Sequence, residues 1–210
     1  MSVLLSEHLE DLSFVSLPLG EATRAFGSSL EKYGSIRTTQ LSCWLDTWAY
    51  LTPLLTFPTR YVLLPFEAWT VVICNMARES CLVDALGVSS ATGCRAVSAR
   101  FRPDARSFHL AVAGHEVRSV LAYKDPTWTF FASGDPQSFE DVTAYTRRRP
   151  SSRLTPSLVL AYVSALIGLS PPLHTIPFPG TAVGVERSTS SVRVPVTVVP
   201  TVLDLACGPA

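Results

Sequence analysis

The stretch that decides the fold is "RYVLLPFEAWTVVICN", residues 60–75. It contains two short runs rich in β-branched and aromatic residues, and only the dipeptide "EA" separates them. Such runs are typical of strands, and Pro65 stands near the end of the first run, where a strand tolerates proline. The short connection favours a hairpin. We therefore predict two antiparallel strands, Arg60–Pro65 and Trp69–Asn75.

Two predicted helices flank this hairpin. Before it, "QLSCWLDTWAYLTPLL" places apolar residues at helical spacing and then reaches Pro53, which ends a helix. The apolar stripe consists of Leu41, Trp44, Leu45, Trp48 and Leu51. After the hairpin, "ESCLVDALGVSSATG" predicts a helix over Ser80–Thr92, with Gly93 as its C-terminal stop.

A further helix is predicted by its end signals. Thr155 is a good N-cap, and Pro156 occupies the first helical position, where its missing N–H costs nothing. Gly168 and Pro171 end the helix. Its expected apolar face consists of Leu158, Tyr162, Ala165, Leu166 and Leu169.

Extended segments fill the chain between these two helices. The stretches "CRAVSARFR" and "SFHLAVAG" alternate apolar and polar residues, as half-buried strands do. "HEVRSVLAYKDPTWTFFASGD" gives two more extended runs around the turn Lys124–Thr127, with a short helix over Val117–Tyr123 as the alternative. This order of elements predicts an α+β fold with a mainly antiparallel sheet packed by helices.

Three regions are expected along the chain. Helical spacing in "SEHLEDLSFVSL" and "GEATRAFGSSLEKYG" predicts an N-terminal helical segment over residues 1–35, and residues 36–170 form a single α+β domain. Residues 171–210 are rich in Pro, Ser, Thr and Val, and their prolines disfavour helices and central strands, so we expect a poorly ordered tail. Its β-prone stretch "SSVRVPVTVV" leaves open a strand lent to a partner's sheet.

The composition disfavours several classes of function. The 210 residues carry 17 basic and 17 acidic side chains, and this zero net charge argues against a dedicated nucleic-acid binder. The five cysteines form no CxxC pair and the usual nucleotide and metalloprotease motifs are absent, so no metal or cofactor is expected. No apolar run reaches the ~20 residues that span a membrane. Free thiols and the lack of a signal peptide predict a cytoplasmic protein.

A cluster of arginines ahead of the last helix is the strongest candidate for a binding surface. Only 16% of residues are charged, yet "EDVTAYTRRRPSSR" contains four arginines. One interpretation is structural, a short helix from Ser138 that is acidic at its start and basic at its end. The other is a contact surface for a partner protein, since arginine pairs with carboxylates bidentately. That surface would consist of Glu140, Asp141, Tyr145, Arg148, Arg149 and Arg153.

An enzyme is the alternative hypothesis. His115 and Glu116 are adjacent, and His109 lies six residues earlier. A histidine beside a carboxylate is typical of acid–base catalysis near neutral pH, and the arginines would serve as an anion clamp. This hypothesis predicts that all these groups converge in one pocket. Two solvated surface histidines would give the same pattern.

The chain from Arg60 to Leu169 resembles a family of small bacterial proteins with no established activity. The shared pattern is W-x-F-x-x-S-G-x-P, then F-E, Y-x-x-R-R, R-x-T-P, L-x-x-Y and a final A-L-G-[IL]. Its positions here are Trp128, Phe130, Ser133, Gly134, Pro136, Phe139, Glu140, Tyr145, Arg148, Arg149, Arg153, Thr155, Pro156, Tyr162 and Ala165. In size and layout this family is similar to immunity-type proteins that neutralise toxins by binding. The resemblance implies a protein partner and occlusion rather than chemistry, and it implies no catalytic residue.

Overall fold

The described residues of the protein form a nine-stranded sheet in the order β2-β9-β3-β4-β1-β5-β6-β7-β8. The structure is a computed structural model that describes residues 11–52, 57–75, 80–168 and 178–188, without the side chains of residues 80–83. Every neighbouring pair of strands is antiparallel, which confirms the predicted α+β class. The strands are β1 (Asp11–Val15), β2 (Ser35–Leu41), β3 (Thr59–Phe66), β4 (Trp69–Cys74), β5 (Arg95–Phe101), β6 (Ala105–Val112), β7 (His115–Lys124), β8 (Trp128–Ser133) and β9 (Ala182–Ser188).

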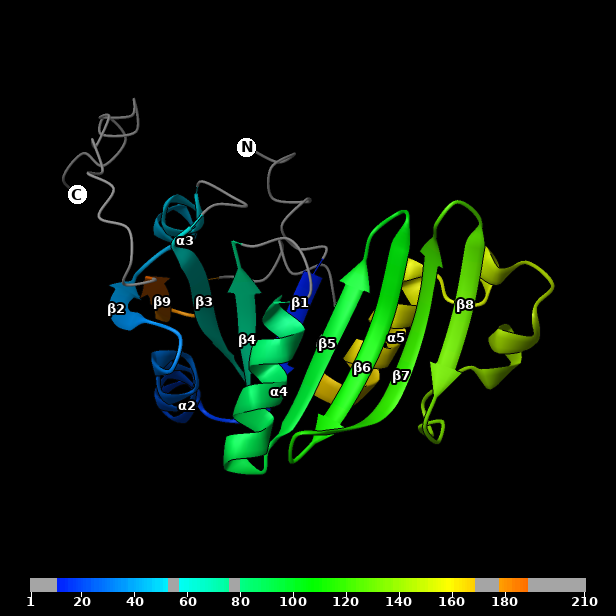
Figure 1. The fold of residues 1–210 in the computed structure, drawn as a ribbon, viewed down its shortest axis with the longest axis horizontal. Coiled ribbons are helices and arrows are strands. Elements are labelled where there is room, and N and C mark those ends of the chain that lie inside the picture. Colours follow the sequence, from blue (N-terminus) through cyan, green and yellow to red (C-terminus); the bar gives the residue numbers. More distant parts are fainter. Residues whose placement is uncertain (1–10, 53–56, 76–79, 169–177, 189–210) are drawn as a thin grey trace.

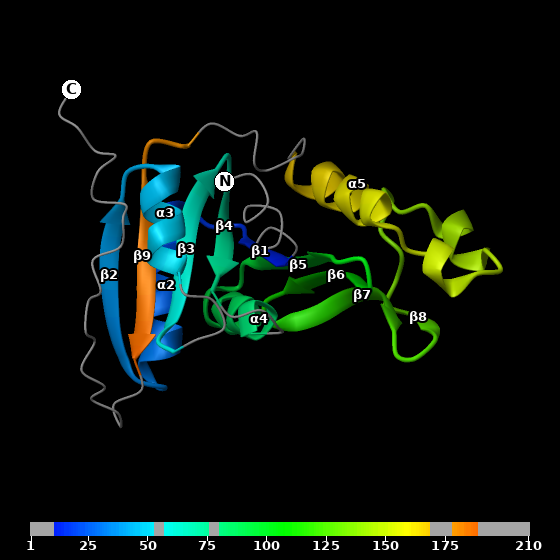
Figure 2. The same ribbon diagram turned by 90° about the horizontal axis from the view of Figure 1, so that it is seen from above.

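Helices cover both faces of the sheet (Figures 1 and 2). Within the described residues they are α2 (Leu19–Glu31), α3 (Trp44–Leu51), α4 (Ser80–Thr92) and α5 (Pro156–Ile167), with short 3-10 helices η1 (Val142–Thr146) and η2 (Pro150–Ser152). One core, with Phe14, Phe108 and Tyr162, lies under α3 and α5, and we call this side the α5 face. A second core, with Val15 and Phe26, lies under α2 and α4, on the α4 face.

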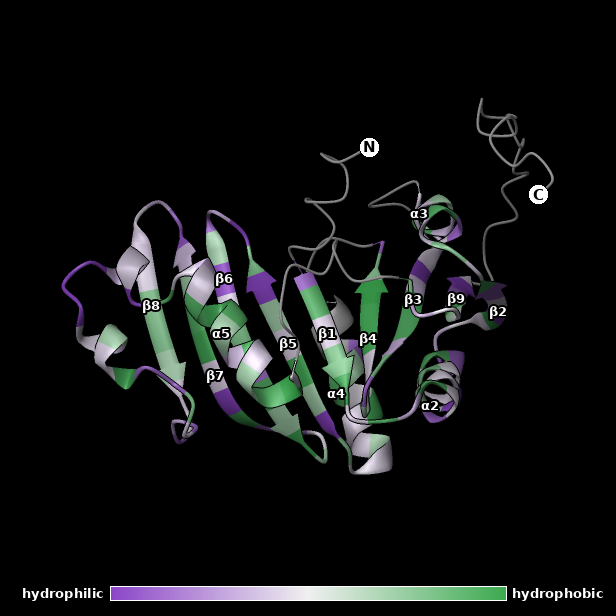
Figure 3. Ribbon diagram, turned by 180° about the vertical axis from the view of Figure 1, so that it is seen from behind, coloured by the Kyte–Doolittle hydropathy of each residue, from purple (hydrophilic) through white to green (hydrophobic). Residues whose placement is uncertain are grey.

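The hairpin at residues 60–75 forms as predicted. β3 and β4 pair from Tyr61 opposite Cys74 to Phe66 opposite Trp69. Nearly all of β4 is buried, because helices cover both sides of the sheet there, and Figure 3 shows it hydrophobic along its length. A strand buried on both faces needs no polar alternation, which explains its continuous apolar run.

The predicted ends of α4 and α5 are confirmed. α4 spans Ser80–Thr92, and Gly93 follows with a φ of +73°. The Thr155 hydroxyl caps α5 by accepting a hydrogen bond from the Leu158 amide at 3.2 Å. The predicted apolar face of α5 is wrong in phase, however. Its buried residues are Val159, Tyr162, Val163 and Ile167, because the packing surface lies one position further round the helix.

Three local predictions need correction. The expected N-terminal helix over residues 1–35 is wrong at Asp11–Val15, which form a central strand of the sheet, although α2 does form. α3 begins at Trp44 rather than at Leu41, because Leu41 is the last residue of β2. The alternative helix over Val117–Tyr123 is wrong, since these residues belong to β7. β1 therefore belongs to the same sheet as the strands of residues 36–168, and α2 packs on the core of the α4 face.

The segment expected to be a poorly ordered tail contributes a strand. Ala182–Ser188 form β9, which lies between β2 and β3 and pairs with both. Gly184 lets the strand pass beneath the Tyr50 ring, because a Cβ there would lie 2.6 Å from that ring. Residues 169–177 and 189–210, including the stretch "SSVRVPVTVV", lie outside the described residues.

Candidate functional site

A buried ion pair lies at the centre of the arginine-rich region. Arg118 projects from β7 onto the α5 face, in phase with Val120, and its side chain is only 3% exposed. The Glu140 side chain is 0% exposed. Arg118 Nε donates to Glu140 Oε1 at 2.9 Å and Nη2 donates to Oε2 at 2.7 Å, which is the bidentate geometry that arginine and a carboxylate favour.

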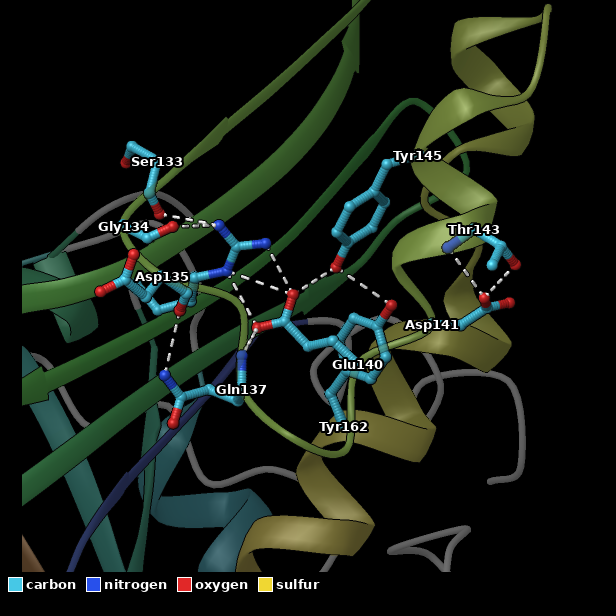
Figure 4. Close-up of polar contacts among 10 residues, drawn as sticks. Ser133, Gly134, Asp135, Gln137, Glu140, Asp141, Thr143, Tyr145 and Tyr162 are labelled. Atoms are coloured by element: carbon cyan, nitrogen blue, oxygen red, sulfur yellow. Dashed lines mark hydrogen bonds and ion pairs between the residues drawn. The ribbon is translucent and has the colours of Figure 1, made fainter.

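The remaining hydrogen bonds of this pair join it to the neighbouring backbone and aromatics (Figure 4). Arg118 Nη1 donates to the carbonyls of Ser133 at 3.0 Å and Gly134 at 2.7 Å. Glu140 accepts from the Gln137 amide at 3.0 Å and from the Tyr145 hydroxyl at 2.6 Å. Buried charges are tolerated only when they are fully hydrogen-bonded. The hydrogen bonds that satisfy Arg118 and Glu140 therefore also hold residues 133–145 against the sheet.

Charge pairing decides the protonation of Glu140. Burial alone raises the pKa of this carboxyl, but the hydrogen bonds from Arg118, the Gln137 amide and Tyr145 outweigh it, so the pKa lies below its usual value. Burial also raises the pKa of the Tyr145 phenol, and the Glu140 carboxylate raises it further. The network therefore holds one carboxylate, one guanidinium and a neutral phenol.

Gly134 fits this network closely. It has a φ of +75°, and a Cβ there would lie 2.1 Å from the carbonyl oxygen of Val117. The register between β6 and β7 shifts at Leu110 and Ala111, which marks a bulge opposite Glu116 and Arg118. The backbone of Gly134 therefore approaches the bulged strand more closely than any other residue type permits.

Aromatic rings surround the ion pair. Phe139 packs on Phe108 with ring centroids 6.0 Å apart, and Tyr145 packs on Phe130 at 5.2 Å. The Arg153 guanidinium lies 5.6 Å from the Phe130 ring. The residues that carry the resemblance described above are thus mostly neighbours in space, around one buried arginine.

The predicted contact residues divide into two groups. Glu140 does not belong to a contact surface, because it is fully buried against Arg118, and the Tyr145 hydroxyl also points inward. Arg153 is partly buried and donates to the Arg147 carbonyl at 2.7 Å. Arg148 and Arg149 are exposed, and within the described ranges neither side chain has an ion pair or hydrogen bond.

The helix predicted from Ser138 is wrong. Only a 3-10 turn, η1, forms, and its N-cap is Asp141, whose carboxylate accepts from the amides of Thr143 and Ala144. Asp141 Oδ2 also lies 3.7 Å from Arg147 Nη2, where both side chains are well exposed. Pro150 begins η2 instead of ending a helix, so the polypeptide turns twice between Asp141 and Arg153. We call residues 141–153 the η1–η2 segment.

The alternative catalytic residues do not converge with the arginines. His109 Nδ1 lies 2.9 Å from Glu116 Oε2 and 3.1 Å from Ser119 Oγ. Both partners compete for the same ring nitrogen, whereas in a catalytic triad the serine and the carboxylate use opposite nitrogens. His109 alternates with Phe108 and so lies on the α4 face, while the η1–η2 segment packs on the α5 face.

His115 lies apart from that pair. It stands opposite Val112, whereas Glu116 stands opposite Ala111, so the two side chains leave opposite faces of the sheet. A cavity of about 300 Å³ does exist, but it lies between α2 and the β2 end of the sheet. Its lining residues are Leu19, Gly20, Thr23, Thr38, Thr39, Gln40, Thr181 and Val183.

No three His, Cys, Asp or Glu side chains in the described ranges are grouped as metal ligands would be. No helix in the described part of the chain is both long and apolar enough to cross a membrane.

Comparisons with protein-family models, curated proteins and solved structures found no match in any of the three.

Sequence reasoning missed Arg118, although the chain contained a signal for it. In "HEVRSVLAY" the arginine shares its phase with Val120 and Ala122, both of which are buried. A charged residue on the apolar phase of a strand requires a buried counter-ion. The acidic residue that meets this requirement is Glu140, 22 positions later.

Proposed function

We propose that this protein is a protein-binding module that recognises an acidic surface of its partner through Arg148 and Arg149. The observation that carries the proposal is that these two side chains are exposed and unpaired in the described structure of a charge-poor chain. Some of the other arginines have carboxylate partners, as Arg60 has Glu186 and Arg100 has Asp11, whereas Arg148 and Arg149 are adjacent in the sequence and have none among the described residues. Exposed arginines without internal partners favour an external one, and arginine is enriched at protein interfaces.

The surroundings of these arginines support a rigid contact surface. Arg153 and Arg147 bind the backbone of the η1–η2 segment, at the Arg147 and Ser152 carbonyls respectively. The buried Arg118–Glu140 pair lies immediately ahead of the same segment. Binding then costs less conformational entropy, because the backbone that presents the two guanidinium groups is already ordered.

The resemblance to immunity-type proteins supplies the proposed mechanism. A cytoplasmic protein of this type neutralises its partner by covering a functional surface, and it performs no chemistry of its own. Arginines at the rim of such an interface attract an acidic partner over a distance, so they raise the association rate more than they slow dissociation.

Affinity capture with charge-reversed variants tests the proposal. The full chain, the variant Arg148→Glu/Arg149→Glu and the matched variant Arg37→Glu/Arg95→Glu serve as baits in lysate of the source cell. Arg37 and Arg95 are also exposed but lie on β2 and β5. We expect a stoichiometric partner with the wild type and the matched variant only. Recovery of the same partner by all three baits would exclude Arg148 and Arg149 as the contact surface.

A further inference from the structure

Within the part of the chain that the structure describes, β8 is an edge strand whose outer side pairs with no other strand, and we call this its open side. Its sheet neighbour is β7, and β8 is the last strand in the order of the sheet. Its sequence, WTFFAS, carries no charge, and Phe131 at its centre is 52% exposed. Edge strands are usually protected by charged side chains, prolines or bulges, because their free backbone groups can pair with another chain. β8 has none of these protections within its six residues.

The opposite edge of the sheet is different. β2 carries Arg37, two threonines and Gln40 in the exposed part of its sequence. Its exposed side chains are therefore polar, and one of them is charged, as is typical of a protected edge. The two edges are thus unequal, and the apolar one is β8.

The η1–η2 segment lies beside the open side of β8. Its Tyr145 and Arg153, which precede and follow η2 in the sequence, both pack on Phe130 of β8. Figures 1 and 2 show the segment projecting past β8 at that end of the sheet. A strand added to β8 would therefore have arginines on its α5 face and Phe131 on its α4 face, because Phe131 alternates with Phe130.

We propose that β8 accepts an extended segment of the partner protein as a tenth strand, with side chains that alternate between carboxylates and apolar groups. The carboxylates face Arg148 and Arg149, and the apolar groups lie beside Phe131. Backbone hydrogen bonds to β8 give affinity, and the alternating side chains give specificity, as in other cases of strand addition. This inference rests on the proposed function and adds to it the conformation and the chemistry of the partner's contact segment.

A peptide of alternating Glu and Val residues is the probe for this site. Its binding to the full chain is measured by fluorescence anisotropy, with a peptide of alternating Lys and Val as the charge control. The variant Phe131→Asp is compared with Tyr33→Asp, because Tyr33 is similarly exposed, at 53%, but lies between α2 and β2. We expect the Glu–Val peptide alone to bind, and Phe131→Asp to weaken its binding at least about tenfold while Tyr33→Asp leaves it unchanged.

Hydrogen exchange separates strand addition from simple charge attraction. If the peptide pairs with β8, the alternate β8 amides that do not already face β7 become protected on binding, and absence of that protection overturns strand addition. No binding of the Glu–Val peptide, or equal binding to Phe131→Asp, also overturns it. In the capture experiment, loss of the partner with Arg148→Glu/Arg149→Glu but full recovery with Phe131→Asp would leave the proposed function standing and end the strand-addition model.

Discussion

Replacing Glu140 by glutamine should destabilise the fold strongly. The substitution keeps the shape of the side chain but leaves Arg118, only 3% exposed, without a counter-ion. Breaking a buried ion pair at one partner costs about 3–5 kcal/mol. For a chain of this size, each kcal/mol lowers the melting temperature by roughly 2–4 °C, so we expect a decrease of about 6–20 °C.

Removing both charges together should cost less than the sum of the two single changes. In Arg118→Leu/Glu140→Leu no unpaired charge remains, and well-packed apolar replacements of buried pairs are often nearly neutral. The carbonyls of Ser133 and Gly134 lose their donor, but Gly134 is exposed and water can reach it. We expect the double variant to be no less stable than Glu140→Gln.

Urea denaturation followed by tryptophan fluorescence measures these free energies of unfolding. Arg147→Gln is the control, because its 3.7 Å ion pair with Asp141 and its hydrogen bond to the Ser152 carbonyl are both exposed, and exposed pairs contribute about 0–1 kcal/mol. A loss of unfolding free energy below about 1 kcal/mol for Glu140→Gln would refute the argument that this pair anchors residues 133–145. The same holds if the losses of Arg118→Leu and Glu140→Leu add up strictly in the double variant.

Three further predictions concern stability. The folded pKa of Glu140 lies below its usual value of 4.5, so the stability that its carboxylate contributes is complete above pH 4.5 and is lost as the pH falls through the folded pKa. Acid titration should therefore lower the free energy of unfolding less in Glu140→Gln than in the wild type. Gly134→Ala should cost more than the ~1–2 kcal/mol of a left-handed L-residue, whereas Gly168→Ala, with φ +79° and open space around it, should cost only that amount by urea denaturation. Cys43→Ser should raise the melting temperature slightly, because a hydroxyl caps α3 better than the Cys43 sulfur, which accepts from the Asp46 amide at 3.4 Å.

Much of the fold could be read from local signals in the sequence. The hairpin at residues 60–75 and the ends of α4 and α5 follow from β-branched runs, caps and glycine stops that act over a few residues. β1 could not be read in this way. It has only five residues and is buried on both faces, so Leu12 and Phe14 meet one core while Val15 meets the other. The alternation of Asp11 and Ser13 with Leu12 and Phe14 covers only four residues before Val15 breaks it, which is too short to distinguish a strand from a helix.

The candidate site was only partly readable for a different reason. The density of arginines located the η1–η2 segment, but it did not distinguish the exposed Arg148 from the buried Glu140. That distinction depends on Arg118, which comes from another strand and pairs across the loop after β8. Long-range pairing of this kind has no local signature in a single sequence. The proline-rich surroundings of β9 concealed that strand as well.

Because β9 comes late in the sequence, the β2 end of the sheet can be completed only after the β8 end. Among the described strands, β9 is the only sheet neighbour of β2, so a nascent chain has no sheet partner for β2 among them until residues 182–188 have left the ribosome. Synthesis proceeds at roughly 5–20 residues per second, and the elements around Arg118 are complete by Ile167. The arginine end can therefore assemble first, and β3 can pair with β4, while β2 waits for the strand that joins it to β3. A chain shortened to end before Ala182 would keep the buried ion pair and lose the strand that holds β2 in the sheet.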